Sequence, residues 1–431
     1  MALDARFRSL LLPFAASAAL TACGHDDASL AGKLVVERDT VGDTVVVRTV
    51  SGSAWGGDRI LEPEVSIGAM EGDPEYLFGQ IGSLGVGPSG TIYVVDRQVP
   101  DLRAYAPDGT YIATLGRPGE GPGELKGPDG GLAVLSDGRV LVRDPGNARI
   151  QVYGPDGKAL ETWTARGGFS TSSPLYRTRD DHVHTQILVD PKADLDDWVI
   201  GLVDIAPDGT PGDTLIPPDA GYEAPYIEAR VDEGDNHSVS RNSVPFSPTE
   251  QSVFSPDGYW IHAISTDYRI DLLRRDAPPL RIERVYEAVP VTAGEKAEEE
   301  RLATRNMRYT NPDWRWNGPP IPDRKPPFTR ILTGRDGRIW VVVSQPAVEV
   351  DDPTYDPKDR SSVPDRWREP IVFDVFEPNG TYLGRVRTPM GFSLYPWPVF
   401  DADHVWAIIR DDLGVQKVVR YRIRADSAVK S

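Results

Sequence analysis

The stretch VDRQVPDLRAYAPDG, residues 95–109, returns 48 residues later as RDPGNARIQVYGPDG, residues 143–157. Both copies carry an early Asp, a Tyr nine residues after it, and a Pro-Asp-Gly turn beyond the Tyr. Self-similarity at a period between forty and fifty residues is typical of repeat architectures. Short β-branched runs separate the Gly, Pro and Asp clusters, so we expect each repeat to consist of strands.

Two kinds of tight turn extend this pattern along the chain. Turns between first and second strands are predicted at 88–90, 136–138, 180–181, 256–258, 335–337 and 401–403. Turns between third and fourth strands are predicted at 107–109, 155–157, 207–209, 275–277 and 378–380. Gly or Asp at these positions supplies the positive φ that a tight hairpin needs.

The six turns of the first kind and five of the second leave the last unit without its own fourth strand. Its third strand is expected at Val415–Arg424, after which the chain ends. An unpaired outer edge invites aggregation and fraying, so a closed ring requires a donor strand. We expect Ile60–Ile67 to be that strand. The turns therefore predict an all-β ring of six four-stranded units.

Other segments interrupt the regular spacing. Leu34–Glu37 and Thr44–Val50 flank a Gly-Asp turn and are expected to pair as a hairpin. Thr292 and Glu295 form a capping box that predicts a surface helix ending near Met307. We expect insertions near residues 220–248, 292–328 and 349–368, all on the faces of the ring, where long loops do not disturb the strands.

Composition excludes one class of partner. The chain has 431 residues with a formal net charge of −18, and Gly 41 and Pro 39 are both abundant. Nucleic-acid binding relies on clustered Lys and Arg, so we expect no nucleic acid. Repeated β folds of this length commonly form one domain, so we expect a single domain.

The N-terminus predicts export. Arg6 and Arg8 precede a short apolar run, Leu10–Leu20, which is too short to span a bilayer and is typical of a secretion signal. The residues that follow, Leu20-Thr21-Ala22-Cys23-Gly24, resemble the lipobox of bacterial lipoproteins. In that family the Cys becomes the first mature residue and carries acyl chains, which hold a protein firmly on a membrane. Cys23 is the only Cys in the chain, so an intramolecular disulfide is impossible.

A wider resemblance covers residues 81–163. The segment Asp144-Pro145-Gly146-Asn147-Ala148-Arg149 and the strand after it resemble the NHL repeat, and the Gly-rich segment 116–125 resembles the linker between NHL blades. Together with the lipobox, the chain is similar to six-bladed β-propeller lipoproteins of Gram-negative bacteria. The resemblance implies an NHL- or TolB-like propeller. It also implies a signal peptide over residues 1–22, a lipidated tether over 23–33, a propeller over 34–431, and an outer-membrane location with a periplasmic or surface face.

The sequence contains few candidate catalytic or metal-binding residues. The sequence has neither a Gly-x-Ser-x-Gly elbow nor a His-Glu-x-x-His motif. His182, His184 and His404 share strand parity and could face alike in an axial funnel, yet their position near turns favours structural or solvated side chains. We therefore predict no cofactor. The alternative, a lactonase-like hydrolase or lyase with its site in the funnel, requires a divalent metal.

A group of aromatic residues with nearby arginines is the candidate recognition surface. Its members are Trp314, Arg315, Trp316, Trp367 and Trp397, most of which lie in or beside the insertions. Trp and Arg are the side chains that most often anchor interfaces. The same residues equally suit pinning the inserted loops to the ring. We expect a non-catalytic scaffold that binds a protein, a small molecule or a glycan.

Overall fold

The strands are grouped in consecutive antiparallel units along the chain. The computed structural model describes residues 33–164, 170–193, 198–233, 236–352, 355, 358, 362–411 and 413–426. Cys23, the predicted signal peptide, most of the tether and part of the 349–368 insertion lie outside the described residues.

The first units are four-stranded meanders whose strands pair in chain order. They are β4 (Ile81–Val86), β5 (Ile92–Asp96), β6 (Asp101–Tyr105) and β7 (Tyr111–Pro118), then β9 (Leu132–Val134), β10 (Val140–Asp144), β11 (Arg149–Tyr153) and β12 (Ala159–Thr164). The short strand β8 (Glu124–Leu125) adds to β7. Next come β13 (Tyr176–Arg177), β14 (Val183–Leu188), β15 (Ile200–Ile205) and β16 (Pro211–Leu215).

Later units follow the same order with additions at their edges. They are β19 (Glu250–Phe254), β20 (Trp260–Ile264), β21 (Arg269–Leu273) and β22 (Leu280–Arg284), then β23 (Phe328–Thr333), β24 (Ile339–Val343), β27 (Val372–Phe376) and β28 (Tyr382–Arg387). The last unit contains β30 (Val399–Asp401), β31 (His404–Arg410) and β32 (Gln416–Ala425), with β29 (Phe392–Ser393) also pairing β31. Two short 3-10 helices, Pro74–Tyr76 and Pro145–Asn147, lie between strands.

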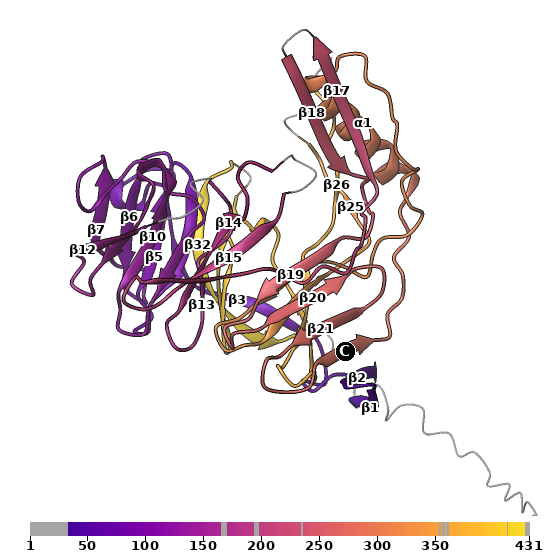
Figure 1. The fold of residues 1–431 in the computed structure, drawn as a ribbon, viewed down its shortest axis with the longest axis horizontal. Coiled ribbons are helices and arrows are strands. Elements are labelled where there is room, and N and C mark those ends of the chain that lie inside the picture. Colours follow the sequence, from indigo (N-terminus) through magenta and orange to yellow (C-terminus); the bar gives the residue numbers. More distant parts are fainter. Residues whose placement is uncertain are drawn as a thin grey trace, which may run out of the picture.

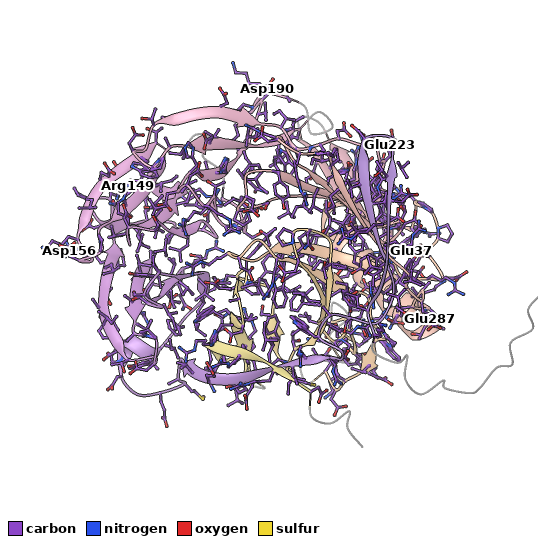
Figure 2. The ribbon with its side chains drawn as sticks, turned by 90° about the horizontal axis from the view of Figure 1, so that it is seen from below. Glu37, Arg149, Asp156, Asp190, Glu223 and Glu287 are labelled. Carbon is purple, nitrogen blue, oxygen red and sulfur yellow. The ribbon has the colours of Figure 1, made fainter. Side chains whose placement is uncertain are left out.

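A strand from the start of the chain completes the last unit. β3 (Arg59–Ile67) runs antiparallel to β32, with Ile60 opposite Arg424 and Ile67 opposite Val418. The predicted pairing of Ile60–Ile67 with the last strand is therefore confirmed. In Figure 2 the colours run around the molecule until violet meets yellow, so the first and last parts of the chain adjoin. Antiparallel units standing around one axis are the arrangement of a β-propeller.

Alternation along each strand explains how neighbouring units adhere. In β10, Val140 and Val142 pack with Val95 and Leu102 of the preceding unit, while Leu141 packs with Val183 and Val203 of the following unit. Successive side chains of a strand point to opposite faces of its sheet. Both faces are buried between units here, so the strand is apolar throughout its middle instead of alternating with polar residues.

The turn positions confirm the hairpin pattern, including its two weakest copies. Gly90 and Gly138 have φ of 82° and 88°, as a tight turn requires. In the two predicted first–second turns without Gly, Asp181 and Ala402 take the same left-handed conformation, with φ of 65° and 51°. Asp tolerates that conformation better than Ala, which has no side-chain hydrogen bond to compensate for it.

The predicted N-terminal hairpin is present as β1 (Val35–Val41) and β2 (Thr44–Ser51). The hairpin does not stand apart from the ring, because β2 pairs in parallel with β22 and extends that unit outward. The β-branched side chains of β2, including the fully buried Val47, join the core between β22 and its neighbours. The hairpin therefore belongs to the ring.

The insertions form an arm that leaves the ring on one side (Figure 1). We call insertion arm the hairpin β17 (Tyr226–Glu233) and β18 (Asn236–Ser243), helix α1 (Ala293–Thr310), and the pair β25 (Val348–Glu349) and β26 (Trp367–Arg368). The predicted capping box is present: the Thr292 hydroxyl accepts from the Glu295 N–H, and the Glu295 carboxylate accepts from the Thr292 N–H. The sequence predicted the helix but not the hairpin on which it packs.

Candidate functional site

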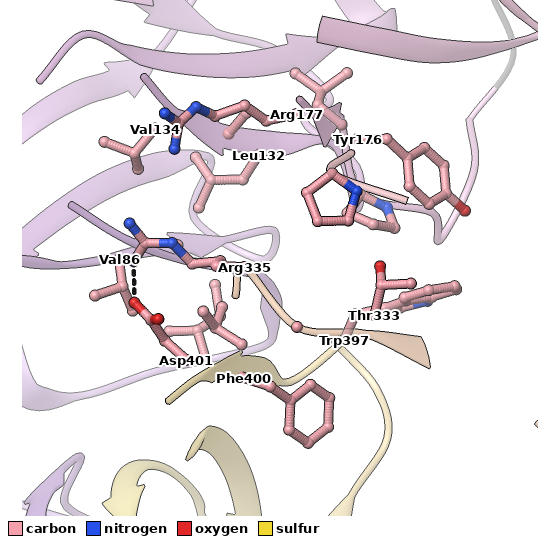
Figure 3. Close-up of a pocket in the computed structure, with 18 of the residues that line it drawn as sticks. Val86, Leu132, Val134, Tyr176, Arg177, Thr333, Arg335, Trp397, Phe400 and Asp401 are labelled. Carbon is pink, nitrogen blue, oxygen red and sulfur yellow. Dashed lines mark ion pairs between the residues drawn. The ribbon is translucent and has the colours of Figure 1, made fainter. Parts of the chain in front are cut away.

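The free edges of the innermost strands converge on the axis of the ring. β4, β9, β13, β19, β23 and β30 each pair with a neighbour on one side only. Each of these strands contributes residues to a pocket of about 390 Å³, shown in Figure 3. We call it the central pocket. Strands of all these units therefore meet in the central pocket.

The position of the central pocket along the axis follows from its lining. Val86, Arg177, Thr333 and Asp401 all stand at the ends of first strands, directly before a first–second turn. The insertions leave from the opposite ends, either between units or between second and third strands. In an antiparallel meander these connections lie on opposite faces. The central pocket therefore occupies the half of the channel that faces away from the insertion arm.

Most of the pocket wall is apolar. Leu84, Leu132, Val134 and Leu175 line it, together with Phe254 and Phe400. Tyr176 and Trp397 meet edge to face with ring centroids 6.2 Å apart. Burial raises the pKa of Tyr176 to about 12, so its hydroxyl stays protonated at neutral pH. The indole Nε1 of Trp397 is buried without a hydrogen-bond partner among the described residues.

Three guanidinium groups and one carboxylate complete the lining. Arg335 Nη1 lies 3.4 Å from Asp401 Oδ2 (Figure 3). Arg177 Nε donates to Asp181 Oδ1 at 2.5 Å. Arg179 forms an ion pair with Asp257, and its Nη2 donates to the backbone carbonyl of Asp336 at 2.9 Å. The Arg177 contact lies within one unit, whereas those of Arg179 and Arg335 join turns of different units, and together they hold the arginines at one end of the pocket.

Arg335 is the least compensated of these groups. Burial lowers the pKa of Arg335, and the nearby charge of Arg177 lowers it further, against the raising effect of Asp401. Its side chain makes no hydrogen bond within the described part of the chain. The Arg335 side chain is 30% exposed, so its N–H donors remain open to a ligand that enters the pocket. The arrangement is able to bind a group that accepts hydrogen bonds and carries negative charge.

The structure separates the residues of the predicted recognition surface. Trp397 lines the central pocket, whereas Trp314, Arg315, Trp316 and Trp367 belong to the insertion arm or its connections. Trp314 is buried between α1 and β17 and its Nε1 donates to the Glu228 carbonyl at 2.7 Å.

Contacts on the arm differ among the remaining residues. Trp316 is half-buried beside Trp314, with ring centroids 6.2 Å apart. Trp367 packs against Gly294 at the start of α1, where a Cβ would meet the indole at 2.6 Å. Arg315 is exposed. Trp314 and Trp367 therefore hold the arm together, while binding by this surface stays a prediction.

Sequence reasoning missed Tyr176, Arg177 and Arg335 as site residues. A signal was available for two of them. Arg335 opens the predicted turn at 335–337, and Arg177 stands shortly before the predicted turn at 180–181. A charged residue at or just beyond the end of a first strand, before the first–second turn, faces the axis once the ring closes. The single sequence does not reveal which of these ends converge.

The histidines do not form one group. His182 Nδ1 lies 2.8 Å and His184 Nε2 lies 3.4 Å from Asp204 Oδ1. His404 instead lies 2.8 Å from Asp403 and 3.3 Å from Glu64 in the last unit. Among the described residues no group of three or more His, Cys, Asp or Glu side chains is arranged to hold a metal ion. The donor set does not fit the divalent metal of the hydrolase alternative, so we derive no step through one.

A second pocket, of about 420 Å³, lies where the chain leaves the ring for the arm. Arg284, Tyr286 and Arg385 are among its lining residues. Beneath it the fully buried Asp374 accepts hydrogen bonds from the Tyr268 hydroxyl at 2.8 Å, the Tyr382 hydroxyl at 2.7 Å and Arg284 at 2.8 Å. Asp374 of β27 thereby ties its own unit to β22 and to the start of β21 in the preceding unit.

Comparisons with known proteins assign no family to the chain. No protein-family model matches the sequence. No curated protein matches it either. Solved structures that resemble it include a protein of Bacteroides fragilis thought to be exported, with a TM-score of 0.45, 11% identity, and coverage of 89% of this chain and 100% of that one.

Two further structures are similar to the same degree. A DUF4221 family member from Bacteroides vulgatus has a TM-score of 0.47 and 10% identity, over 85% of this chain and 98% of its own. Virginiamycin B lyase from Staphylococcus aureus has a TM-score of 0.41 and 10% identity, over 84% and 99%. With TM-scores this low, we transfer no activity from these proteins. The strand pairing itself defines the class: an all-β protein of the β-propeller type.

Proposed function

We propose that this chain is an exported, lipid-anchored six-bladed β-propeller that binds a small ligand in the central pocket and does not transform it. The carrying observation is the pocket itself, a cavity of about 390 Å³ whose wall combines apolar and aromatic side chains with convergent charged groups. Ligand sites of globular proteins have this size and composition, and they prefer the mouths and axes of closed β structures.

The count of six blades is supported by the strand order. Four-stranded units begin at β4, β9, β13, β19 and β23, and a sixth begins at β30 and is completed by β3. The type of propeller is a further proposal: Asp144 accepts hydrogen bonds from the backbone N–H groups of Lys126 and Gly127, and from Asn147. The residues of the NHL-like motif thus tie a blade to the linker before it.

The lipid anchor on Cys23 rests on the lipobox resemblance alone. No helix within the described residues is long and apolar enough to cross a membrane. An anchored protein should partition with membranes when Cys23 is present and with the soluble fraction after Cys23→Ser. Equal partitioning of both forms would remove this part of the proposal.

Placing a bulky side chain in the central pocket tests whether a ligand binds there. Thr333 lies on β23 and lines the pocket, whereas Thr329 on the same strand is exposed. In a thermal-shift screen of small organic molecules, we expect some compounds to raise the melting temperature of the native protein and of Thr329→Phe, but not of Thr333→Phe. The bulky ring occupies the space that the ligand needs. Compounds that stabilise all three equally would contradict the proposal.

The insertion arm is a second candidate for binding, with a protein as partner. Tyr309 on α1 is 79% exposed and Arg315 is also exposed, and both residue types are common in interfaces. Pull-down with Tyr309→Ala and Arg315→Ala tests this idea, since both substitutions leave the buried side of the arm intact. Partners captured equally by the native chain and the variants would argue against it.

A further inference from the structure

The central pocket separates its charged and apolar groups. In Figure 3 the guanidinium groups of Arg177 and Arg335 reach the same side of the pocket, and the rings of Tyr176 and Trp397 lie on the other. Val86, Leu132 and Val134 of β4 and β9 also line the pocket, on the side of the guanidinium groups (Figure 3). A ligand that satisfies both sides has a charged end and a flat apolar body.

The charge of the ligand follows from the hydrogen-bonding state of the two arginines. Arg177 uses Nε to bind Asp181, which also accepts from the Ser136 N–H at 3.0 Å, so this side chain is anchored while its terminal amino groups stay available. Arg335 contacts Asp401 only at 3.4 Å. A negative group between the two guanidiniums would supply acceptors and relieve their mutual repulsion.

The kind of anion follows from the carboxylate already present. Asp401 lines the same pocket as Arg335, so added negative charge is partly opposed. Each of the three arginines is already paired with a carboxylate, so the net positive charge is small, while the cost of removing an anion from water rises steeply with its charge; this favours a monoanion over a dianion such as a phosphate monoester. A carboxylate also matches the planar fork of a guanidinium through two parallel hydrogen bonds. Cations are disfavoured, because three arginines line the pocket.

Resting on the proposed binding function, we propose that the ligand is a carboxylic acid with a flat apolar body. The carboxylate lies between Arg177 and Arg335, and the apolar body packs against Tyr176 and Trp397. This orientation directs the body of the ligand away from the turns and along the axis.

Matched probes separate charge from shape. 2-Naphthoate, 2-naphthalenemethanol, 2-naphthyl phosphate and 2-naphthylmethylamine share one ring system and differ in their polar group. Titrated into the purified protein and followed by calorimetry, naphthoate should bind about tenfold or more tightly than the alcohol, because hydrogen bonds to charged groups are strong. The phosphate should bind more weakly than naphthoate, and the amine most weakly.

Substitutions locate the effect. In Arg335→Gln the preference for naphthoate over the alcohol should fall to about twofold or less, while affinity for the alcohol is kept. Arg335→Lys should recover part of the preference, because it restores charge without the planar fork. The control is Arg275→Gln, an exposed arginine in a third–fourth turn, which should leave all affinities unchanged.

The outcomes distinguish this inference from the proposed function. If the alcohol binds as tightly as naphthoate and Arg335→Gln changes nothing, the pocket binds ligands but the inference is wrong. If 2-naphthyl phosphate binds more tightly than naphthoate, the carboxylate assignment is overturned in favour of a dianion. If none of the probes binds, the inference is overturned, and the thermal-shift screen then decides on the proposed function independently.

Discussion

Asp101 shows how burial and ion pairing compete at one residue. Its Oδ2 accepts from Arg103 Nε at 3.0 Å, while its Oδ1 is buried without a partner among the described residues. Burial outweighs the attraction of Arg103 and raises the pKa of Asp101 from 3.8 to about 6. Ionisation of this carboxyl group therefore lowers the stability of the folded state.

Asp101 should therefore make the protein less stable as pH rises from about 4 to 6. The folded state binds the extra proton in this window, so stability falls as the proton leaves, and above pH 6 the cost is complete. After allowance for solvent screening the cost is about 1–2 kcal/mol. In Asp101→Asn, the free energy of unfolding relative to the native protein should rise across the window, as measured by urea titration at each pH.

Asp108 provides a control of opposite sign. Hydrogen bonds from the Thr110 backbone and side chain lower the pKa of Asp108, so its contribution is present above the ordinary pKa and is lost on acidification. Asp108→Asn should thus lose stability at neutral pH and match the native protein at low pH. A pH-independent difference between Asp101→Asn and the native chain would show that Asp101 does not titrate in this window.

At the scale of elements, the insertion arm is a small folding unit of its own. α1 presents Ala303 and Met307 to Ile227 and Ala229 of β17, and Trp314 completes this core. The Glu298 carboxylate accepts from the Trp367 N–H at 2.9 Å, which ties β26 to the helix. At the base, Lys325 is 1% exposed and lies 2.5 Å from Glu295 and 2.7 Å from Glu369.

Trp314→Ala should loosen the arm and leave the ring intact. Removing a buried aromatic side chain costs about 3–5 kcal/mol, and here the loss falls on a core that is separate from those of the blades. We expect faster hydrogen exchange in α1 and β17 with unchanged exchange in β23 and β24. Trp316→Ala, at a half-buried neighbour, should have a smaller effect. Uniformly faster exchange throughout the chain would show that the arm and the ring unfold together.

The elements were predictable where local chemistry decides them. Turn residues fixed the hairpins, and the capping box of Thr292 and Glu295 fixed the start of α1. Hairpin β17–β18 was missed although Ile227, Ala229 and Val231 of β17 alternate with charged residues, because β18 is mostly polar and the hairpin forms against α1 and Trp314. The parallel pairing of β2 with β22 was missed because no local signal links segments so far apart in sequence.

At the scale of the molecule, the candidate site exists only when the ring is closed. Arg177, Arg335 and Trp397 come from separate units and meet through the order of the blades. Trp397 was predicted as a binding residue because of its residue type, but the sequence did not predict its position in the central pocket. The turn pattern places both arginines next to first–second turns, but it does not show which of these turns converge on one pocket, so the arginines of the site were not identified beforehand.

Closure by β3 is therefore the claim on which the central pocket depends. Glu62 of β3 lies opposite Arg422 of β32, so their side chains share one face. Directly opposite residues lie within reach of a disulfide bond. Cys23 is the only native Cys, so Cys23→Ser gives a background free of thiols. Arg420, opposite Val65, is too far along the strand to bond a residue at position 62.

The most direct test is thiol counting and melting of Glu62→Cys/Arg422→Cys in the Cys23→Ser background under oxidising conditions. We expect no free thiol and a melting temperature about 5 °C above that of the reduced form, because the bond closes a very long loop. Glu62→Cys/Arg420→Cys should keep both thiols free. Two free thiols and unchanged melting in the first pair would show that the N-terminal strand does not close the ring.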